Sequence, residues 1–374
     1  MAPPFLDVRV ITSGVETFHH GGDPLAFNPF DQFQRSLNYP RAWLYAFVLL
    51  NIRDQRAWLM GLFFCALYLL CISKLIAEAG TVLEQLTLLV AALSIAPLFA
   101  IERGNIDLPV FAMVFLGTAL AKPWQRAGMF WLATVLKLFP IAALAAEAIR
   151  QREGKRLGAI ATLAAACVAL AAQANDLRLI ARGTPVAQYA SYGVLSIKET
   201  LWCFLLRHTL VVRSASFIAL AALLSVLIGG ALFAFWAWRR PPSIEGPLLQ
   251  SPAADRFFLF GAIYVSTFAI GSNWDYRLIF LIPTLPFAFA LLRTEAHFRL
   301  GFSYIVSVLL VENCVAFDGG YKTLVAEAVS VAVFLLQLTI LAQIAKMHVL
   351  GERRFATSAN ASFVKLQRTV GIEI

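Results

Sequence analysis

The chain has 374 residues, of which 60% are hydrophobic and only 14% are charged. Soluble domains carry about 25% charged residues, so the composition excludes a soluble globular protein and indicates an all-α polytopic membrane protein. The net charge of +9 is typical of basic loops on the cytoplasmic side and of contact with anionic membrane lipid, and no nucleic-acid partner is expected.

The chain opens with a polar, Gly- and Pro-punctuated stretch, residues 1–41, which we predict to be an ordered extracytoplasmic loop or small subdomain. Residues 42–51 are apolar but too short to cross a membrane, which takes about 20 residues, so we expect an interfacial or re-entrant helix. A single transmembrane domain of roughly 9–11 helical segments then occupies 42–348, and 349–374 form a cytoplasmic tail. Candidate spans lie near 57–74, 85–101, 106–121, 127–149, 157–174, 216–238, 257–272, 276–292, 301–317 and 323–345.

Short loops rich in Lys and Arg set the orientation of such a chain, because these loops stay in the cytoplasm. The basic loops follow alternate spans except around 127–149, where one crossing would place a basic loop outside. Lys137 and Pro140 lie in the middle of that segment, and proline interrupts a helix. We therefore predict a broken hairpin that turns at Lys137, a structure that membranes tolerate where it lines a cavity.

This topology gathers several polar motifs on the outer face, among them AIERGNID (Ala100–Asp107) and GSNWDYR (271–277). Ionisable groups at a membrane edge are costly unless they pair or act, so they mark a candidate site. A carboxylate can accept a proton from an attacking hydroxyl, and Arg or Lys can hold a phosphate leaving group. An inverting sugar transfer needs no second, nucleophilic carboxylate. The candidate site residues on this face are Asp7, Arg9, Glu102, Arg103, Asn105, Lys137, Asp275 and Arg277, with a carboxylate among them as base.

Four stretches in order resemble glycosyltransferase family 87, a branch of the GT-C superfamily that includes polyprenol-phosphate-mannose-dependent mannosyltransferases. They are DVRVITSGVE…GGDPLAFNPFDQFQRSLNYPRAW, SIAPLFAIERGNIDLPVF, ATVLKLFPIAAL and NWDYRLIFLIPTLP, and together they cover most of residues 5–290. The resemblance implies a GT-C-like helical bundle, a lipid-phosphate sugar donor, an extracytoplasmic active site and an aspartate base at Asp7. Family members have a transmembrane helix before the first outer loop. This chain begins almost at Asp7, so we expect that a first helix is missing.

Each candidate residue also has a structural interpretation. Asp7 could pair with Arg9, with Asp23 and Asp31 as rival bases in the same loop. Asn105 and Asp107 could cap the helix that follows them. Lys137 could pair with a buried carboxylate such as Glu147, and Asp275 and Arg277 could form an interfacial ion pair.

The sequence thus predicts an integral membrane enzyme, by analogy in a bacterial inner membrane and cell envelope. It would move a mannose-like or other hexose from a polyprenyl-phosphate donor to a glycan or glycolipid acceptor on the extracytoplasmic side, with inversion. No cofactor is expected, although a divalent metal held by Asp7 and a second carboxylate stays open. The alternatives are a transporter or flippase of a lipid-linked or small anionic substrate, whose charges would lie near the bilayer midplane, and an inactive relic.

Overall fold

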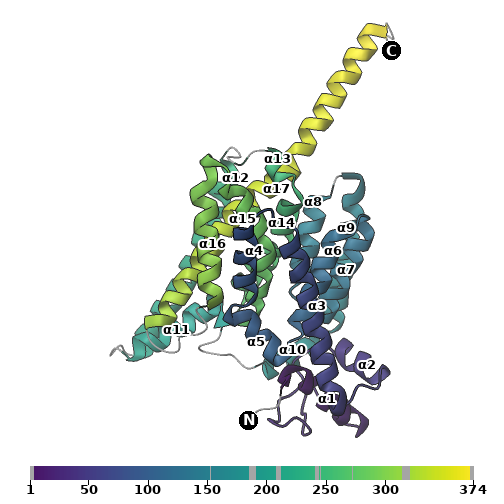
Figure 1. Ribbon diagram of the computed structural model, residues 1–374, viewed down its shortest axis with the longest axis vertical. Coiled ribbons are helices and arrows are strands. Elements are labelled where there is room, and N and C mark those ends of the chain that lie inside the picture. The colour runs from purple at the N-terminus through teal and green to yellow at the C-terminus, as the bar shows by residue number, and fades with distance from the viewer. Residues whose placement is uncertain are drawn as a thin grey trace.

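The computed structural model shows a helical bundle with a separate cap of short elements at one end (Figure 1). It describes residues 4–151, 153–184, 191–207, 212–240, 244, 246–271, 273–313 and 321–370, with backbone alone at 153–154, 207, 212–213, 321–323 and 350–370. Six helices in this part of the chain are long and apolar enough to cross a membrane, so the chain is an integral membrane protein.

The six candidate spans come from α3, α9, α12, α14, the joined pair of η2 and α15, and α17. They cover Asp54–Ala77, Lys155–Ala172, Ser214–Arg239, Pro252–Ile270, Asp275–Leu292 and Leu324–Val349. A seventh is the bent pair α4 (Val82–Ala92) and α5 (Ile95–Arg103), whose axes differ by 50°. The remaining bundle helices are α6 (Asp107–Ala119), α7 (Pro123–Leu136), α8 (Ile141–Arg150) and α16 (Phe298–Asn313).

The predicted hairpin at 127–149 is confirmed, because α7 and α8 run in opposite directions on either side of Lys137–Pro140. Its open end is fixed by an ion pair between Arg126 and Glu147, whose Nε and Oε1 atoms are 3.4 Å apart. Arg150 next to it reaches Asp255 at the start of α14 (Pro252–Ile270), at 2.8 Å. The basic loops before α7, after α8 and before α14 therefore meet at one end of the bundle, as the charge pattern predicts. We call this the basic end.

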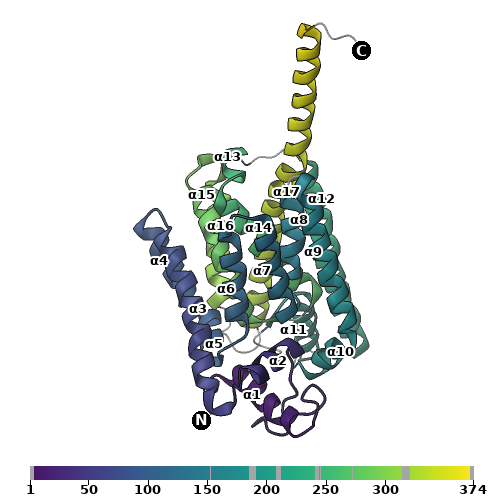
Figure 2. The ribbon, with the colours of Figure 1, turned by 90° about the vertical axis from the view of Figure 1, so that its right-hand side faces the viewer.

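The cap lies at the other end of the bundle, which we call the cap end (Figures 1 and 2). It holds α1 (Leu6–His19), the loop 20–40 and α2 (Arg41–Leu49). Residues 6–19 are helical rather than loop because Val8, Ile11 and Val15, at helical spacing, are completely buried. The short α2 agrees with the expected interfacial helix, and the Trp43 indole donates a hydrogen bond of 2.9 Å to the Leu136 carbonyl at the end of α7.

Two further departures concern the long loops. Much of 175–215, the stretch between the candidate spans 157–174 and 216–238, forms two helices instead of a loop, α10 (Ala174–Gly183) and α11 (Val194–Arg207). A two-stranded ladder of β1 (Ser191–Tyr192) and β2 (Asn273–Trp274) ties this segment to the predicted 272–277 loop. In the tail, α17 (Tyr321–Val370) continues past 349 as helix, and residues 371–374 lie outside the described residues. The other short elements are η1 (Asp54–Arg56), α13 (Gly246–Leu249) and η3 (Glu295–His297).

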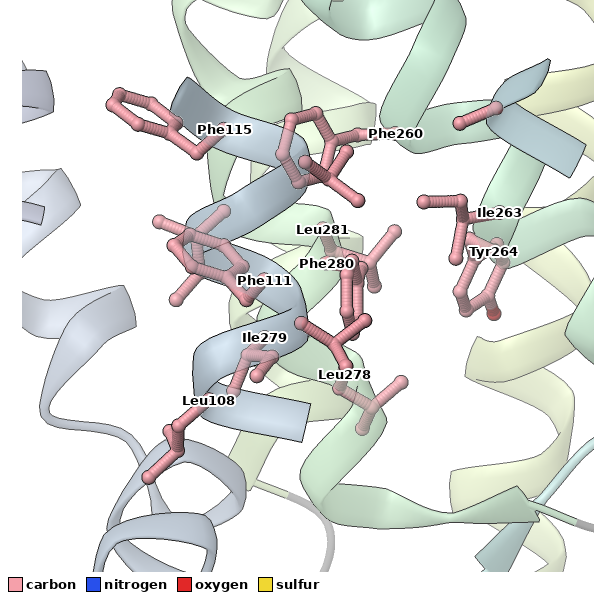
Figure 3. Packing of buried hydrophobic residues seen from close by; sticks show 14 of the residues in the cluster. Leu108, Phe111, Phe115, Phe260, Ile263, Tyr264, Leu278, Ile279, Phe280 and Leu281 are labelled. Carbon is pink, nitrogen blue, oxygen red and sulfur yellow. The ribbon is translucent and has the colours of Figure 1, made fainter. Parts of the chain in front are cut away.

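After β2 the chain enters the bundle as η2 (Asp275–Thr284), a ten-residue 3₁₀ helix that continues as α15 (Leu285–Leu292). Runs of 3₁₀ helix beyond three or four residues are uncommon and often mark a functional or strained segment. Figure 3 shows its apolar side chains facing α6 and α14, with Phe280 near Phe111. Phe111, Phe260 and Phe280 are all at most 1% exposed. This layer of closely packed rings separates the two polar ends of the bundle.

Candidate functional site

Asp7 lies in the first turn of α1 and is held by two groups from the end of α5. Arg103 donates from Nη2 to Oδ1 at 2.6 Å and from Nε to both carboxylate oxygens at 3.1–3.2 Å. The Asn105 amide donates to Oδ2 at 2.5 Å. Four hydrogen bonds thus reach a carboxylate that can accept about four, two on each oxygen. A further hydroxyl would bind Asp7 by taking the place of one of these donors.

The turn after α5 explains why Arg103 and Asn105 converge on one carboxylate. Gly104 adopts φ = +57°, and the backbone N–H groups of Gly104 and Asn105 bond back to Ile101 and Ala100. This is the Schellman arrangement, in which a glycine in the left-handed region ends a helix. Phe5 docks on the same turn, because its backbone N–H donates to the Glu102 carbonyl at 3.1 Å. The turn at Gly104 therefore does two things: it holds the start of α1 through Phe5, and it directs Arg103 and Asn105 to Asp7.

A second ion-pair group lies next to the first. Asp107 is completely buried at the start of α6, and its Oδ1 is 2.6 Å from Lys137 Nζ at the α7–α8 turn. Arg277 of η2 approaches the other oxygen at 3.4 Å and also donates to the Asn273 side chain. Asn105 links the two groups, since its side-chain oxygen accepts from the Asp107 backbone N–H at 2.8 Å while its amide donates to Asp7. Asn105 thus caps α6 and binds Asp7 at once.

Arg35 extends the site into the cap. It donates to Asp31 from Nη2 at 2.8 Å, and its Nη1 is 3.9 Å from Asp7 Oδ1. Burial raises the pKa of the Asp31 carboxyl, but hydrogen bonds from Arg35 and from two backbone N–H groups outweigh it and leave that pKa below its ordinary value. Arg35 therefore carries its own counter-ion and adds a cation at the edge of the Asp7 group.

Aromatic rings surround these charges. The Lys137 ammonium lies 5.1 Å from the centre of the Tyr39 ring and 6.0 Å from that of Tyr276. The Arg103 guanidinium lies 5.4 Å from the Phe99 ring. Burial, with Asp7 nearby, raises the pKa of the Tyr39 hydroxyl well above its ordinary value, so this group is a neutral donor. Such rings favour cations and can also pack against the faces of a sugar.

Three predicted site residues lie elsewhere. Arg9 turns to another side of α1, where its Nη1 is 2.7 Å from Asp54, so the suggested Asp7–Arg9 pair is wrong. The Glu102 side chain is exposed, and only its backbone contributes to the turn. Asp275 is buried, but its carboxylate is not the one that pairs with Arg277, so the suggested Asp275–Arg277 pair is wrong as well.

The remaining alternatives are resolved by the same contacts. Asp23 pairs with Arg41 at 2.9 Å and Asp31 with Arg35, so neither rival carboxylate binds Arg103. Lys137 does pair with a buried carboxylate, but this is Asp107, whereas Glu147 lies at the basic end.

Sequence reasoning missed Asp107 and Arg35 as members of the site. Asp107 could have been predicted as a site residue, because a charged residue between two apolar spans is expected to have a buried partner. In the described part of the chain, no group of three or more His, Cys, Asp or Glu side chains is placed to hold a metal ion.

Around Asp7 and Asp107 the site therefore combines three carboxylates with four cations from separate segments of the chain. A scan against protein-family models and a search of curated proteins find no match for this chain.

Proposed function

We propose that the chain is a membrane glycosyltransferase that moves a hexose, mannose or a similar sugar, from a polyprenyl-phosphate donor to an extracytoplasmic glycan or glycolipid. The observation that carries the proposal is that a buried carboxylate, Asp7, lies among four cations at the cap end. Arg35, Arg103, Lys137 and Arg277 outnumber Asp7, Asp31 and Asp107 by one. The described site therefore has a positive excess that suits a phosphate.

In the proposed reaction, Asp7 accepts the proton of an acceptor hydroxyl while the hydroxyl oxygen attacks the anomeric carbon. The bond from that carbon to the phosphate oxygen breaks, and its electron pair leaves with the lipid phosphate. Attack opposite to the leaving group inverts the anomeric centre, and one carboxylate suffices. Arg103 orients Asp7, and Lys137 and Arg277 are the nearest buried cations that can take up the charge of the phosphate.

Two features of the fold support a reaction on the extracytoplasmic side of the membrane. The basic loops lie at the opposite end from Asp7, which by the charge rule favours an extracytoplasmic position for Asp7. In a bacterial cell this membrane would be the inner membrane. The rings of Phe111, Phe260 and Phe280 are buried and in mutual contact, which favours a reaction at one face over the alternative, transport across the midplane.

The test is sugar transfer in vesicles that contain the purified protein. Polyprenyl-phosphate hexose with a radiolabelled sugar is compared with a labelled nucleotide sugar, each with membrane glycolipid as the acceptor. We expect labelled glycolipid from the lipid donor alone. Movement of labelled donor across the vesicle without any new covalent product would overturn the proposal and favour a flippase.

A further inference from the structure

A cavity of about 790 Å³ lies at the basic end, on the far side of the phenylalanine layer from Asp7. Its walls come from α3, α4, α6, α7, α13, α14 and α15, and Figure 2 shows α4 standing to one side of α13 and α15. Pockets of about 300–1,000 Å³ bind small molecules and cofactors. None of the residues proposed for sugar transfer lines this cavity, so a ligand bound here would be separate from the sugar donor and acceptor.

The carboxylates in its lining are already neutralised. Glu78 lies 2.6 Å from Arg256, and Glu84 lies 2.5 Å from Arg293, which are both lining residues as well. Asp255 lies 2.8 Å from Arg150. Each lining acid therefore has a cation within ion-pair distance, although Asp255 shares Arg150 with Glu147. The lining acids leave no uncompensated negative charge that would attract a cationic ligand.

With Arg150 and Glu147 included, five cations lie among four carboxylates at this cavity, so one positive charge is in excess. Arg126 is only 8% exposed, and its Nε and Nη2 atoms have no hydrogen-bond partner among the described residues. The nearest carboxylate, Glu147, already accepts two bonds of 2.8–2.9 Å from Arg150 and one from Gln151. Lys74 takes part in none of the ion pairs between described residues. Arg126 keeps Glu147 as an ion-pair partner at 3.4 Å, but buried N–H groups without a hydrogen bond are costly. An anion in the cavity would supply the missing acceptors.

The rest of the lining is apolar and includes Leu75, Phe115, Leu248 and Phe289. The cavity also lies where the first candidate span ends, at Ala77, hence at the level of the lipid headgroups. We propose that it binds the phosphate of an anionic phospholipid from the cytoplasmic leaflet. Arg126 and Lys74 hold the phosphate, and the acyl chains follow the apolar wall. The inference does not rest on the proposed transferase activity.

The test is lipid binding to the purified, delipidated protein, measured by native mass spectrometry in detergent. The ligands are phosphatidylglycerol, phosphatidylcholine, diacylglycerol and soluble glycerol phosphate. The double variant Lys74→Gln/Arg126→Gln is compared with Arg239→Gln/Arg240→Gln, which removes the same charge from exposed positions at the same end. Lys74→Gln alone changes an exposed side chain and guards against misfolding of the double variant.

We expect one phosphatidylglycerol to bind more tightly than the other three ligands. The cavity variant should weaken phosphatidylglycerol binding about 30-fold, because it removes two basic groups that attract the anionic headgroup. Lys74→Gln removes one such group and should weaken binding about 5-fold. The surface variant should retain most of the affinity. Equal losses in both double variants would show that only the general charge of this end matters. Equally tight binding of glycerol phosphate would show a site for soluble phosphates. Either result overturns the proposal.

Discussion

The buried pair of Lys137 and Asp107 gives the sharpest prediction for stability. Their atoms are 2.6 Å apart, and the side chains are 9% and 0% exposed. Replacing Lys137 with Met removes the closest cation from Asp107, which is too buried for water to solvate. Arg277, at 3.4 Å, then remains as the ion-pair partner of Asp107. Breaking a buried ion pair by removing one partner costs about 3–5 kcal/mol. We expect Lys137→Met and Asp107→Leu each to lower the free energy of unfolding by about that amount.

The double variant Lys137→Met/Asp107→Leu should lose less than the sum of the two single changes. Groups in one buried network are coupled by about 0.5–3 kcal/mol, and we expect a coupling of about 2 kcal/mol because Arg277 keeps Asn273 as a partner. The assay is unfolding in mixed micelles by titration with a denaturing detergent, followed by Trp fluorescence. If the losses of the single variants simply add, the two groups do not interact, and this part of the site is wrong.

Two further predictions concern the cap. Because the folded-state pKa of Asp31 is lowered, the stability that this carboxyl adds is present above its unfolded value of 3.8 and is lost as the pH falls through the folded value. Proteolysis of the loop 20–40 should therefore accelerate below about pH 4, and Arg35→Gln should remove this acid step; an unchanged step in the variant would contradict the assignment. Gly104→Ala should loosen the cap, since its Cβ would lie 2.8 Å from the Phe5 ring and φ is +57°. We expect a loss of about 1–3 kcal/mol, and Gly128→Ala, with open space around it, should change stability far less; equal effects would refute the reasoning.

The bundle follows directly from the sequence because apolar length and basic loops are local signals. The 216–238 run carries no charge and is the core of α12 (Val212–Arg239). The broken hairpin at Lys137 was also predictable, since a charge and a proline interrupt one apolar run. Both inferences use only residues that are close together in the chain.

The pairing inside the site was not predictable in the same way. Asp7 has Arg9 two residues away, but a helix points these side chains in different directions, and Arg103 arrives only when α1 docks on the Gly104 turn. Asp275 and Arg277 are separated in the same manner by η2, so Arg277 reaches Asp107 instead. Partners that are about a hundred residues apart depend on packing, which no local pattern specifies.

The central claim is that Asp7 acts as the base of sugar transfer, and one comparison tests it most directly. Transfer from the polyprenyl-phosphate donor is measured for Asp7→Asn and for Asp54→Asn, a half-exposed carboxylate that pairs with Arg9 on α1. Loss of a positioned base typically costs 10²–10⁴-fold in rate. We predict a fall of about 10³-fold for Asp7→Asn, measured on protein shown to be folded, and near-normal transfer for Asp54→Asn. A folded Asp7→Asn protein that transfers sugar at the unmodified rate would contradict the account.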